Sequence, residues 1–207
     1  MEIVGIWRYL VKSLQGEALD AAVVERDGLE GDRRWGIRDE HAGRILTARR
    51  RPELLHAAAS YRDAQPLITL PDGRTAQGPG PTTNRLLSEW LGSPVSLVTA
   101  VVEAPGRAEY FEDATDDTSQ AIEWTMPHSR YVDAAAVLVL TTASLRTAAA
   151  LHPAGPGSLD ASGPTSSCTP LSVRTATGGS RTPGSGRPCR PGRRFSVRWR
   201  DASAARW

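Results

Sequence analysis

The residues most able to do chemistry are Lys12 and Ser13, which stand together near the start of the chain. Lys12 is the only lysine in the sequence, and an Asp32-Arg33-Arg34 run follows it in the same N-terminal part. A lysine offers a phosphate a point charge, a serine a short hydrogen bond, and an arginine a two-pronged clamp. These residue types predict an anion-binding site, with a solvated lysine at an ordinary strand end as the simpler alternative.

Three further residues, Arg33, Arg34 and Asp133, depend on the elements that orient them. Arg33 and Arg34 alternate across a predicted strand, so only one of them can face a cleft while the other stays in solvent, and Asp32 is placed to orient either one. Asp133 lies inside an apolar run, where a carboxylate is costly unless it is paired. A ligand contact, a cap and an ion pair all remain open for Asp133.

Short β-favouring segments separated by turn residues must position these side chains. The pattern predicts strands over residues 2–9, 18–26, 33–38, 43–47, 57–62, 67–70, 74–76 and 95–102, with the strongest at 131–140. Helical pieces are expected from Pro52, from Thr82 or Thr83 to Gly92, and from the capping residues 141–144 to Leu151. The polar, acidic residues 104–130 are predicted to form a surface loop.

Composition divides the chain in two. Residues 153–207, the tail, hold nine arginines and two aspartates, so the tail carries +7. Because the whole chain carries +2, residues 1–152 carry −5 and read as an ordinary acidic domain. The basic charge is therefore no sign of specific nucleic-acid binding, and the tail has the composition of a disordered segment.

Metal, disulfide and membrane signals are weak. Cys168 and Cys189, the two cysteines, both lie in the tail, and the histidines have no partners at ligand spacing. The acidic residues 112–117 lack the pattern of a calcium loop. No apolar run approaches the roughly 20 residues that span a bilayer. We therefore expect a cytoplasmic protein without a membrane partner and with no metal-ligating or catalytic side chain that the residues alone identify.

Five stretches taken in order resemble one family. They are RYLVKSLQGE, GLEGDRRWGIRD, GRILTARRRPELL, TTNRLLSEWLG and YVDAAAVLVLTTASL. Together they resemble the MOSC (molybdenum cofactor sulfurase C-terminal) domain with its N-terminal β-barrel, as found in bacterial MOSC reductases and the mitochondrial amidoxime-reducing component. The chain departs from that pattern at Leu10, where the family commonly has proline.

The resemblance implies an α+β, mainly β fold. It comprises an N-terminal β-barrel-like domain over residues 1–100, the start of an incomplete MOSC barrel over 101–152, and the non-native or disordered tail over 153–207. It also implies binding of the molybdenum cofactor, a molybdopterin, and of pyridoxal phosphate. The implied cofactor-binding residues are Lys12, Ser13 and Arg33 at the phosphate, Thr47 and Arg49 in the same pocket, and Asp133, Thr142 and Ser144 on the pterin side.

The activity implied by the resemblance is an oxidoreductase that reduces N-hydroxylated or N-oxygenated small molecules with electrons from a separate reductase. In that family a cysteine in a later Arg-Cys-x-x-Thr segment holds the molybdenum, as suits a soft metal. This chain lacks the segment, so we expect no cofactor retention and no turnover. The alternatives are a noncatalytic phosphate- or pterin-binding module, an inert fragment, and a nucleic-acid binder that works through the tail.

The tail also reads as a shifted frame. If the true frame begins one base earlier, residues 160–167 permit Arg-Arg-Phe-Arg-Pro-Asn-Val-Leu and residues 180–186 permit Glu-x-Asp-x-Trp-Val-Gly. Residues 204–207 then permit Arg-Cys-x-Met, the segment that carries the metal-ligating cysteine. We therefore hypothesise a frameshift near Pro153.

Overall fold

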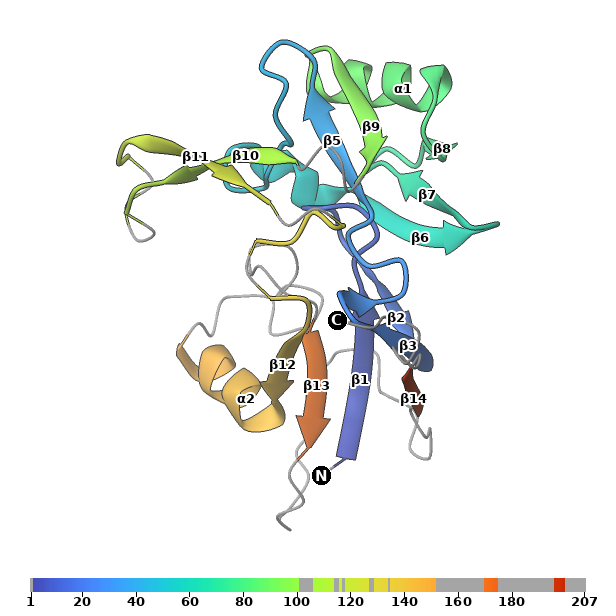
Figure 1. The fold of residues 1–207 in the computed structure, drawn as a ribbon, viewed down its shortest axis with the longest axis vertical. Coiled ribbons are helices and arrows are strands. Elements are labelled where there is room, and N and C mark those ends of the chain that lie inside the picture. Colours follow the sequence, from blue (N-terminus) through green and yellow to red (C-terminus); the bar gives the residue numbers. More distant parts are fainter. Residues whose placement is uncertain are drawn as a thin grey trace, which may run out of the picture.

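The computed structural model describes residues 2–100, 106–113, 116, 118–126, 129–133, 135–151, 170–174 and 196–199. These residues are mainly β, with two α-helices and one 3₁₀-helix. Figure 1 shows two groups of elements, an upper one built on β5 to β11 with α1 and a lower one built on β1 to β4 and β12 to β14 with α2.

The lower group contains a four-stranded sheet in the order β12-β13-β1-β2. Its strands are β1 (Glu2–Arg8), β2 (Glu17–Leu19), β12 (Leu138–Thr141) and β13 (Pro170–Arg174). β1 is antiparallel to both β2 and β13, and β12 is parallel to β13. α2 (Thr142–Leu151) follows β12 directly and lies beside it at the edge of the sheet (Figure 1).

A second sheet of the lower group packs on the first. It has the order β14-β3-β4 and consists of β3 (Ala21–Glu25), β4 (Gly28–Leu29) and β14 (Ser196–Trp199). Alternating apolar residues place four side chains in a shared core: Ile6, Ala22, Val24 and Leu29. This packing fixes β1, and with it the residues that follow β1.

The upper group contains two sheets. One pairs β5 (Trp35–Asp39) with β9 (Val95–Thr99), and the other has the order β6-β7-β8 with β6 (Ala58–Arg62), β7 (Gln65–Thr69) and β8 (Thr75–Gln77). Asp63 and Ala64 join β6 to β7 with φ values of 49° and 62°, as a two-residue type I′ turn requires. The 3₁₀-helix η1 (Pro52–His56) leads into β6.

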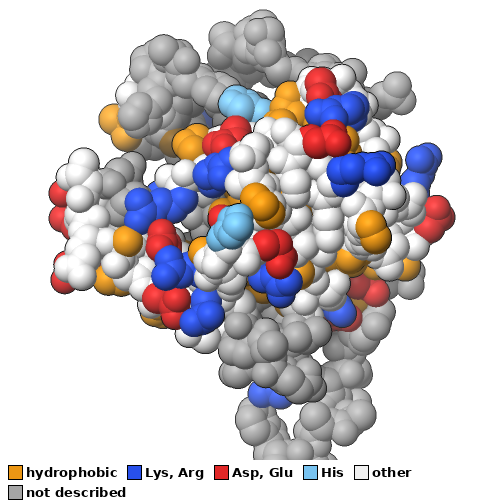
Figure 2. Space-filling view, turned by 90° about the horizontal axis from the view of Figure 1, so that it is seen from above, with side chains coloured by type: hydrophobic (Ala, Val, Ile, Leu, Met, Phe, Trp, Pro, Cys, Tyr) orange, Lys and Arg blue, Asp and Glu red, His pale blue; other side chains and the backbone are white. Residues whose placement is uncertain are grey.

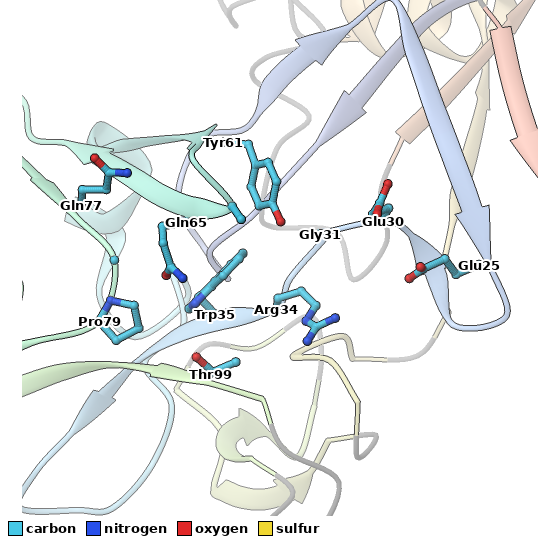
Figure 3. Close-up of a pocket in the computed structure, with 12 residues that line it drawn as sticks. Glu25, Glu30, Gly31, Arg34, Trp35, Tyr61, Gln65, Gln77, Pro79 and Thr99 are labelled. Atoms are coloured by element: carbon cyan, nitrogen blue, oxygen red, sulfur yellow. The ribbon is translucent and has the colours of Figure 1, made fainter. Parts of the chain in front are cut away.

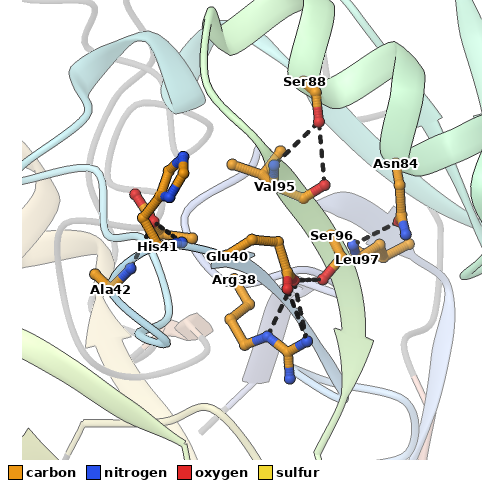
Figure 4. Close-up of polar contacts among 10 residues, drawn as sticks. Arg38, Glu40, His41, Ala42, Asn84, Ser88, Val95, Ser96 and Leu97 are labelled. Carbon is orange, nitrogen blue, oxygen red and sulfur yellow. Dashed lines mark hydrogen bonds and ion pairs between the residues drawn. The ribbon is translucent and has the colours of Figure 1, made fainter.

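α1 (Pro81–Leu91) covers the β5–β9 pair. Figure 4 shows its two polar anchors: Ser88 Oγ accepts from Val95 N at 3.0 Å, and Asn84 Oδ1 accepts from Leu97 N at 3.0 Å. Gly92 ends the helix in the left-handed region, at φ 66°. Below α1 lies the main core, made by Leu10, Val11, Leu14, Trp35, Ile37, Leu54, Ala57, Ala59, Ile68, Leu70, Leu87, Leu91, Val95 and Leu97.

The turn after β5 is tied to β9 (Figure 4). Asp39 Oδ1 accepts the backbone N–H groups of His41 and Ala42 at 2.8 and 2.9 Å. Ser96 donates to Glu40, whose carboxylate also accepts from the Arg38 guanidinium. The Ser96 and Arg38 hydrogen bonds hold the pKa of Glu40 below its ordinary value.

The expected surface loop over residues 104–130 is wrong for much of its length. The structure places a hairpin there, formed by β10 (Arg107–Phe111) and β11 (Ala121–Thr125), which projects from the upper group in Figure 1. Ala108 on β10 is fully buried, whereas all five residues of β11 are exposed. Because one side of the hairpin faces solvent, its sequence is mostly polar, and the two strands were not predicted from it.

Two expected strands are corrected as well. Residues 43–47 form only one bridge, from Ile45 to Arg38, because β9 pairs along the whole of β5. Of the apolar run 131–140, only its end enters β12. Tyr131 lies outside the strand, because its backbone N–H donates to Arg33 O at 2.9 Å. The start of the run therefore packs against the N-terminal part of the chain and does not extend β12.

The expected barrels are not closed in the part of the chain described here. Its strands form separate sheets, and none closes into a ring. A physical reason lies at Ser13 and Arg33, whose φ values of 69° and 49° interrupt the extended backbone between β1 and β5. The isolated bridge from Val11 to Trp35 and the hydrogen bond from Arg33 N to Tyr9 O at 2.6 Å join the chain there, without a continuous strand pairing.

The tail is described at two segments only, residues 170–174 and 196–199. Both are strands, β13 and β14, and the expectation of a non-native or disordered tail stays a prediction. Cys168, Cys189 and the frame-shifted stretches lie outside the described residues. Both segments have a β-favouring pattern, because polar Ser and Arg alternate with Leu and Val in PLSVR and with Val and Trp in SVRW.

The surface carries charges of both signs. Figure 2 shows basic and acidic side chains interspersed over the face seen from above. Several are ion-paired, among them Arg74 with Glu89 at 3.0 Å and Arg107 with Glu123 at 3.3 Å. Neither described helix has the length and apolar character needed to cross a membrane.

Candidate functional site

Lys12 lies where the chain crosses from β1 to β5. Its backbone N–H donates to Trp35 O at 2.9 Å, and Trp35 N donates back to Leu10 O at 3.1 Å. The residue is only 5% exposed. Two backbone hydrogen bonds therefore hold the sole lysine of the chain in the interior, at the junction of the two groups of elements.

The ammonium group of Lys12 has two partners, and both come from the segment that follows the β10–β11 hairpin. Nζ lies 2.5 Å from Asp133 Oδ1 and donates to Tyr131 O at 3.3 Å. Tyr131 can pack here because residue 36 is glycine: a Cβ at Gly36 would lie 2.9 Å from the Tyr131 ring. The ion pair is one of the roles that the sequence left open for Asp133.

Burial dominates the protonation of Lys12. It lowers the pKa of the ammonium group below the ordinary value of 10.5, and the nearby Arg33 charge lowers it further. The Asp133 carboxylate opposes both effects. Lys12 is therefore a cation whose charge depends on an anion beside it.

Ser13 adds a hydroxyl next to this cation. It is buried, and its φ of 69° is in the left-handed region that non-glycine residues rarely adopt. Its Oγ accepts the backbone N–H of Ala48 at 2.9 Å, so the hydroxyl hydrogen can be donated to another acceptor. The strained backbone is held by the packing around it.

Arg33 is the second buried cation. Its Nη1 lies 2.7 Å from Asp32 Oδ2, and its guanidinium carbon lies 5.1 Å from the centre of the Tyr9 ring. Asp32 is fully buried, and its Oδ1 accepts the backbone N–H of Tyr9 at 2.7 Å. Of the two arginines, Arg33 faces inward and Arg34 is exposed, and Asp32 orients Arg33.

Arg130, a residue that the sequence alone does not indicate, holds the backbone at Asp32 in this site. The side chain is 1% exposed, and its Nη1 donates to the carbonyl oxygens of Leu29 and, at 2.8 Å, Asp32. Its Nη2 lies 2.8 Å from Glu25 Oε2, and Asp27 also pairs with it. No signal in the sequence marks it, because its partners are backbone carbonyls and acids about 100 residues earlier.

Thr47 and Arg49 flank the same site on the other side of Ser13. Thr47 is 8% exposed, and its Oγ1 has no hydrogen-bond partner among the described residues. Arg49 is exposed. Because Ala48 between them donates to Ser13, the three consecutive residues stay beside the lysine segment. An unsatisfied buried hydroxyl is costly unless a ligand or water completes it.

Thr142 and Ser144 do not join the others. The strand register places Thr141 opposite Val173, and Val173 opposite Ile3. Lys12 lies beyond the other end of β1, and a strand rises about 3.3 Å per residue, so the start of α2 is far along the sheet from the lysine. There Thr141 Oγ1 accepts the backbone N–H of Ser144 at 3.0 Å, which caps the helix.

We refer to Lys12, Ser13, Asp32, Arg33 and Asp133 as the Lys12 cluster. Two cations and two carboxylates are paired in it, so its formal charges cancel. An ammonium, a hydroxyl and a forked guanidinium at one place are suited to hold an oxyanion. No group of His, Cys, Asp and Glu that could hold a metal ion occurs in the described part of the chain.

Comparison with known proteins identifies the part of the chain that carries most of this cluster. Residues 1–103 match the family model described as the MOSC N-terminal beta barrel domain. These residues form a MOSC N-terminal domain. No curated protein and no solved structure matches the chain.

The MOSC N-terminal domain contains Lys12, Ser13, Arg33, Thr47 and Arg49. Asp133, Thr142 and Ser144 lie after it. The cluster is thus shared between the MOSC N-terminal domain and the segment that follows it, with the Lys12–Asp133 ion pair as the direct link.

Proposed function

We propose that this chain binds the phosphate group of an organic cofactor of the molybdopterin class through Lys12, Ser13 and Arg33. The observation that carries the proposal is the position of Asp133, whose carboxylate lies against the Lys12 ammonium in the interior. A carboxylate oxygen occupies the place that a phosphate oxygen would take, so the site already has the geometry of anion recognition.

The donor set fits a phosphate in chemistry and in number. Lys12 supplies a point charge, Arg33 a fork and Ser13 a hydroxyl hydrogen. The unpartnered Thr47 Oγ1 supplies one more hydrogen-bonding group at the margin of the cluster. A phosphate that enters would replace Asp133 at Lys12, because the buried ammonium cannot stay charged without an anion.

The fit covers the phosphate end of the cofactor only. Lys12, Ser13 and Arg33 would hold that end, and the molybdenum, when bound, would supply the redox chemistry. The described residues offer no metal-ligating set. We therefore propose the reduction of N-hydroxylated or N-oxygenated compounds, with a separate electron donor, only for an intact form that has the ligand cysteine, and no turnover for this chain.

Thermal unfolding of the full chain in a titration of inorganic phosphate tests the proposal. Phosphate is expected to raise the midpoint of wild type and to leave that of Lys12→Met unchanged. Because Lys12→Met alone leaves Asp133 buried without its partner, the double variant Lys12→Met/Asp133→Asn provides a neutral pair of similar shape.

A matched control is Arg74→Gln, which removes an exposed cation from the β7–β8 turn and should leave the phosphate effect intact. If the double variant responds to phosphate like wild type, phosphate binds elsewhere and the proposal fails. If phosphate does not raise the unfolding midpoint of wild type, the result favours the alternative that the chain is an inert fragment.

A further inference from the structure

A second site lies on the other side of the strand start that holds Arg33. It is a pocket of about 640 Å³, within the range typical of small-molecule sites. Figure 3 shows its lining, which comes from β3, the residues after β4, the start of β5 and the sheet β6-β7-β8. None of the residues expected to hold the cofactor lines it.

Arg34 is the cation of this pocket. The left-handed backbone of Arg33, at φ 49°, directs Arg33 into the cluster and Arg34 out into the pocket. In Figure 3 the Arg34 guanidinium lies between Trp35 on one side and Glu25 and Glu30 on the other. Arg34 is exposed, and it makes no ion pair with any described residue. An unpaired guanidinium beside a pocket is a two-pronged receptor for a carboxylate.

Aromatic rings border the space beside Arg34. Tyr61 is 39% exposed, and its ring centre lies 6.1 Å from that of the buried Trp35, with the planes tilted by 53°. Arg8 lies over the Tyr61 ring at 4.6 Å and holds it in place. The Tyr61 hydroxyl points toward the space between Trp35 and Arg34 (Figure 3). This wall suits a planar ring.

Two side-chain amides, those of Gln65 and Gln77, form the end of the pocket away from Arg34. Gln77 donates from Nε2 to Arg62 O at 3.0 Å, which fixes the amide and leaves its Oε1 as an acceptor. Gln65 lines the pocket next to it. A ligand ring that reaches this end of the pocket binds more tightly if it carries a hydrogen-bonding substituent opposite its carboxylate.

The acidic side of the pocket limits the ligand to one negative charge. Glu25 and Glu30 both line it, and Glu25 is already paired with Arg130 at 2.8 Å. A second carboxylate on the ligand would meet these two acids and be repelled. The lining therefore selects a monoanion over a dianion.

We propose that the Arg34 pocket binds a small aromatic monocarboxylate with a hydrogen-bonding ring substituent. The carboxylate pairs with Arg34, the ring lies along Tyr61 and the edge of Trp35, and the substituent reaches Gln65 and Gln77. This site is separate from the phosphate site at Lys12 and does not depend on it.

Isothermal titration calorimetry of the full chain with 4-hydroxybenzoate tests the proposal, with the uncharged 4-hydroxybenzamide as matched ligand. Wild type should bind the carboxylate at least tenfold more tightly than the amide. Arg34→Gln should lose at least tenfold in affinity for the carboxylate, and Arg34→Lys, which keeps the charge but not the fork, should lose less.

Arg74→Gln is the matched control for loss of an exposed arginine, and it should bind like wild type. The far-ultraviolet circular dichroism of each variant reports whether it is folded. Equal binding of the two ligands, wild-type affinity in Arg34→Gln, or no binding by wild type up to millimolar ligand would each overturn the proposal. Arg34→Lys keeps it testable if Arg34→Gln does not fold.

Discussion

Asp133 Oδ1 lies 2.5 Å from Lys12 Nζ, although 121 positions separate the two residues. The contact joins the MOSC N-terminal domain to the segment that follows it. Both side chains are largely shielded, with exposures of 6% for Lys12 and 17% for Asp133, so removing one partner costs more than it does at the surface. Asp133 acts as an internal anion that keeps the buried lysine charged, and an incoming phosphate must compete with it.

Asp133→Asn should lower stability and raise the response to phosphate. Without its partner the buried Lys12 charge is uncompensated, which we expect to cost about 2–4 kcal/mol in the absence of phosphate. Phosphate should recover more of this loss in the variant than it adds to wild type, because it no longer displaces a carboxylate. Urea unfolding with and without inorganic phosphate measures both terms.

The surface variant Asp72→Asn serves as the control, since Asp72 pairs with Arg74 in an exposed turn. Because both partners of this pair are in solvent, the substitution should change stability little and leave the phosphate response as in wild type. An Asp133→Asn chain as stable as wild type would show that the ion pair is not the support of Lys12 that we infer.

Arg130→Met should be among the most damaging substitutions in the described part of the chain. It leaves the carbonyl of Asp32 and the carboxylates of Glu25 and Asp27 without their buried cation. Loss of one partner from a buried charged network costs about 3–5 kcal/mol. Chemical denaturation gives the difference, and Arg107→Met, which removes an exposed ion-pairing arginine, provides the comparison.

The effect of Arg130→Met should also depend on pH. Burial raises the pKa of Asp27, but hydrogen bonds from Arg130 and Ser129 outweigh it and hold the pKa below 3.8. Because the folded pKa is lowered, this stabilisation is present above pH 3.8 and is lost as pH falls through the folded value. The stability gap between wild type and variant should narrow below about pH 4. A gap constant from pH 7 to pH 3 would contradict the assignment.

Thr47→Val should raise the stability of the chain and weaken its binding of phosphate. The Thr47 hydroxyl is buried without a partner among the described residues, so replacing it by a methyl group of similar shape should stabilise the chain by about 1 kcal/mol. If that hydroxyl completes the phosphate site, the phosphate-dependent shift should shrink at the same time. A variant that loses stability would mean that Thr47 Oγ1 is satisfied in solution, for example by water.

Local signals in the sequence were enough for much of the fold. Glycine after the end predicts α1, although the helix begins at Pro81 with Gly80 as its N-cap and not at a Thr82 or Thr83 cap. The turn residues predict the β7–β8 hairpin, because it depends on neighbours in the chain. The hairpin β10–β11 was not predicted because charged residues mark both strands, as in the Arg107–Glu123 pair, and the apolar Ile122 and Trp124 of β11 are exposed rather than part of a core.

Only part of the candidate site could be predicted from the sequence. Residue type indicates that Lys12 and Arg33 can bind an anion, but the partner of Lys12 depends on a contact between distant segments. The separation of Thr142 and Ser144 from Lys12 follows from the register of β12, β13 and β1, which no local pattern specifies. Arg130 is found only from the geometry, since its partners are set by the tertiary fold.

The coding DNA near codon 153 tests the frameshift hypothesis. The frameshift hypothesis requires that a single insertion or deletion there restore an open frame through the stretches read at residues 160–167, 180–186 and 204–207. A chain expressed from the restored frame would gain the Arg-Cys segment, and we expect it to retain molybdenum in near-stoichiometric amount. The chain with the present tail should contain little or none, because its sequence lacks the Arg-Cys-x-x-Thr segment that carries the ligand cysteine in the family it resembles. Elemental analysis of the two purified chains, with a Cys→Ser variant of the restored chain as control, compares them directly. If no single insertion or deletion near codon 153 restores the open frame, the frameshift hypothesis fails. Near-stoichiometric molybdenum in the present chain would contradict the expected lack of cofactor retention.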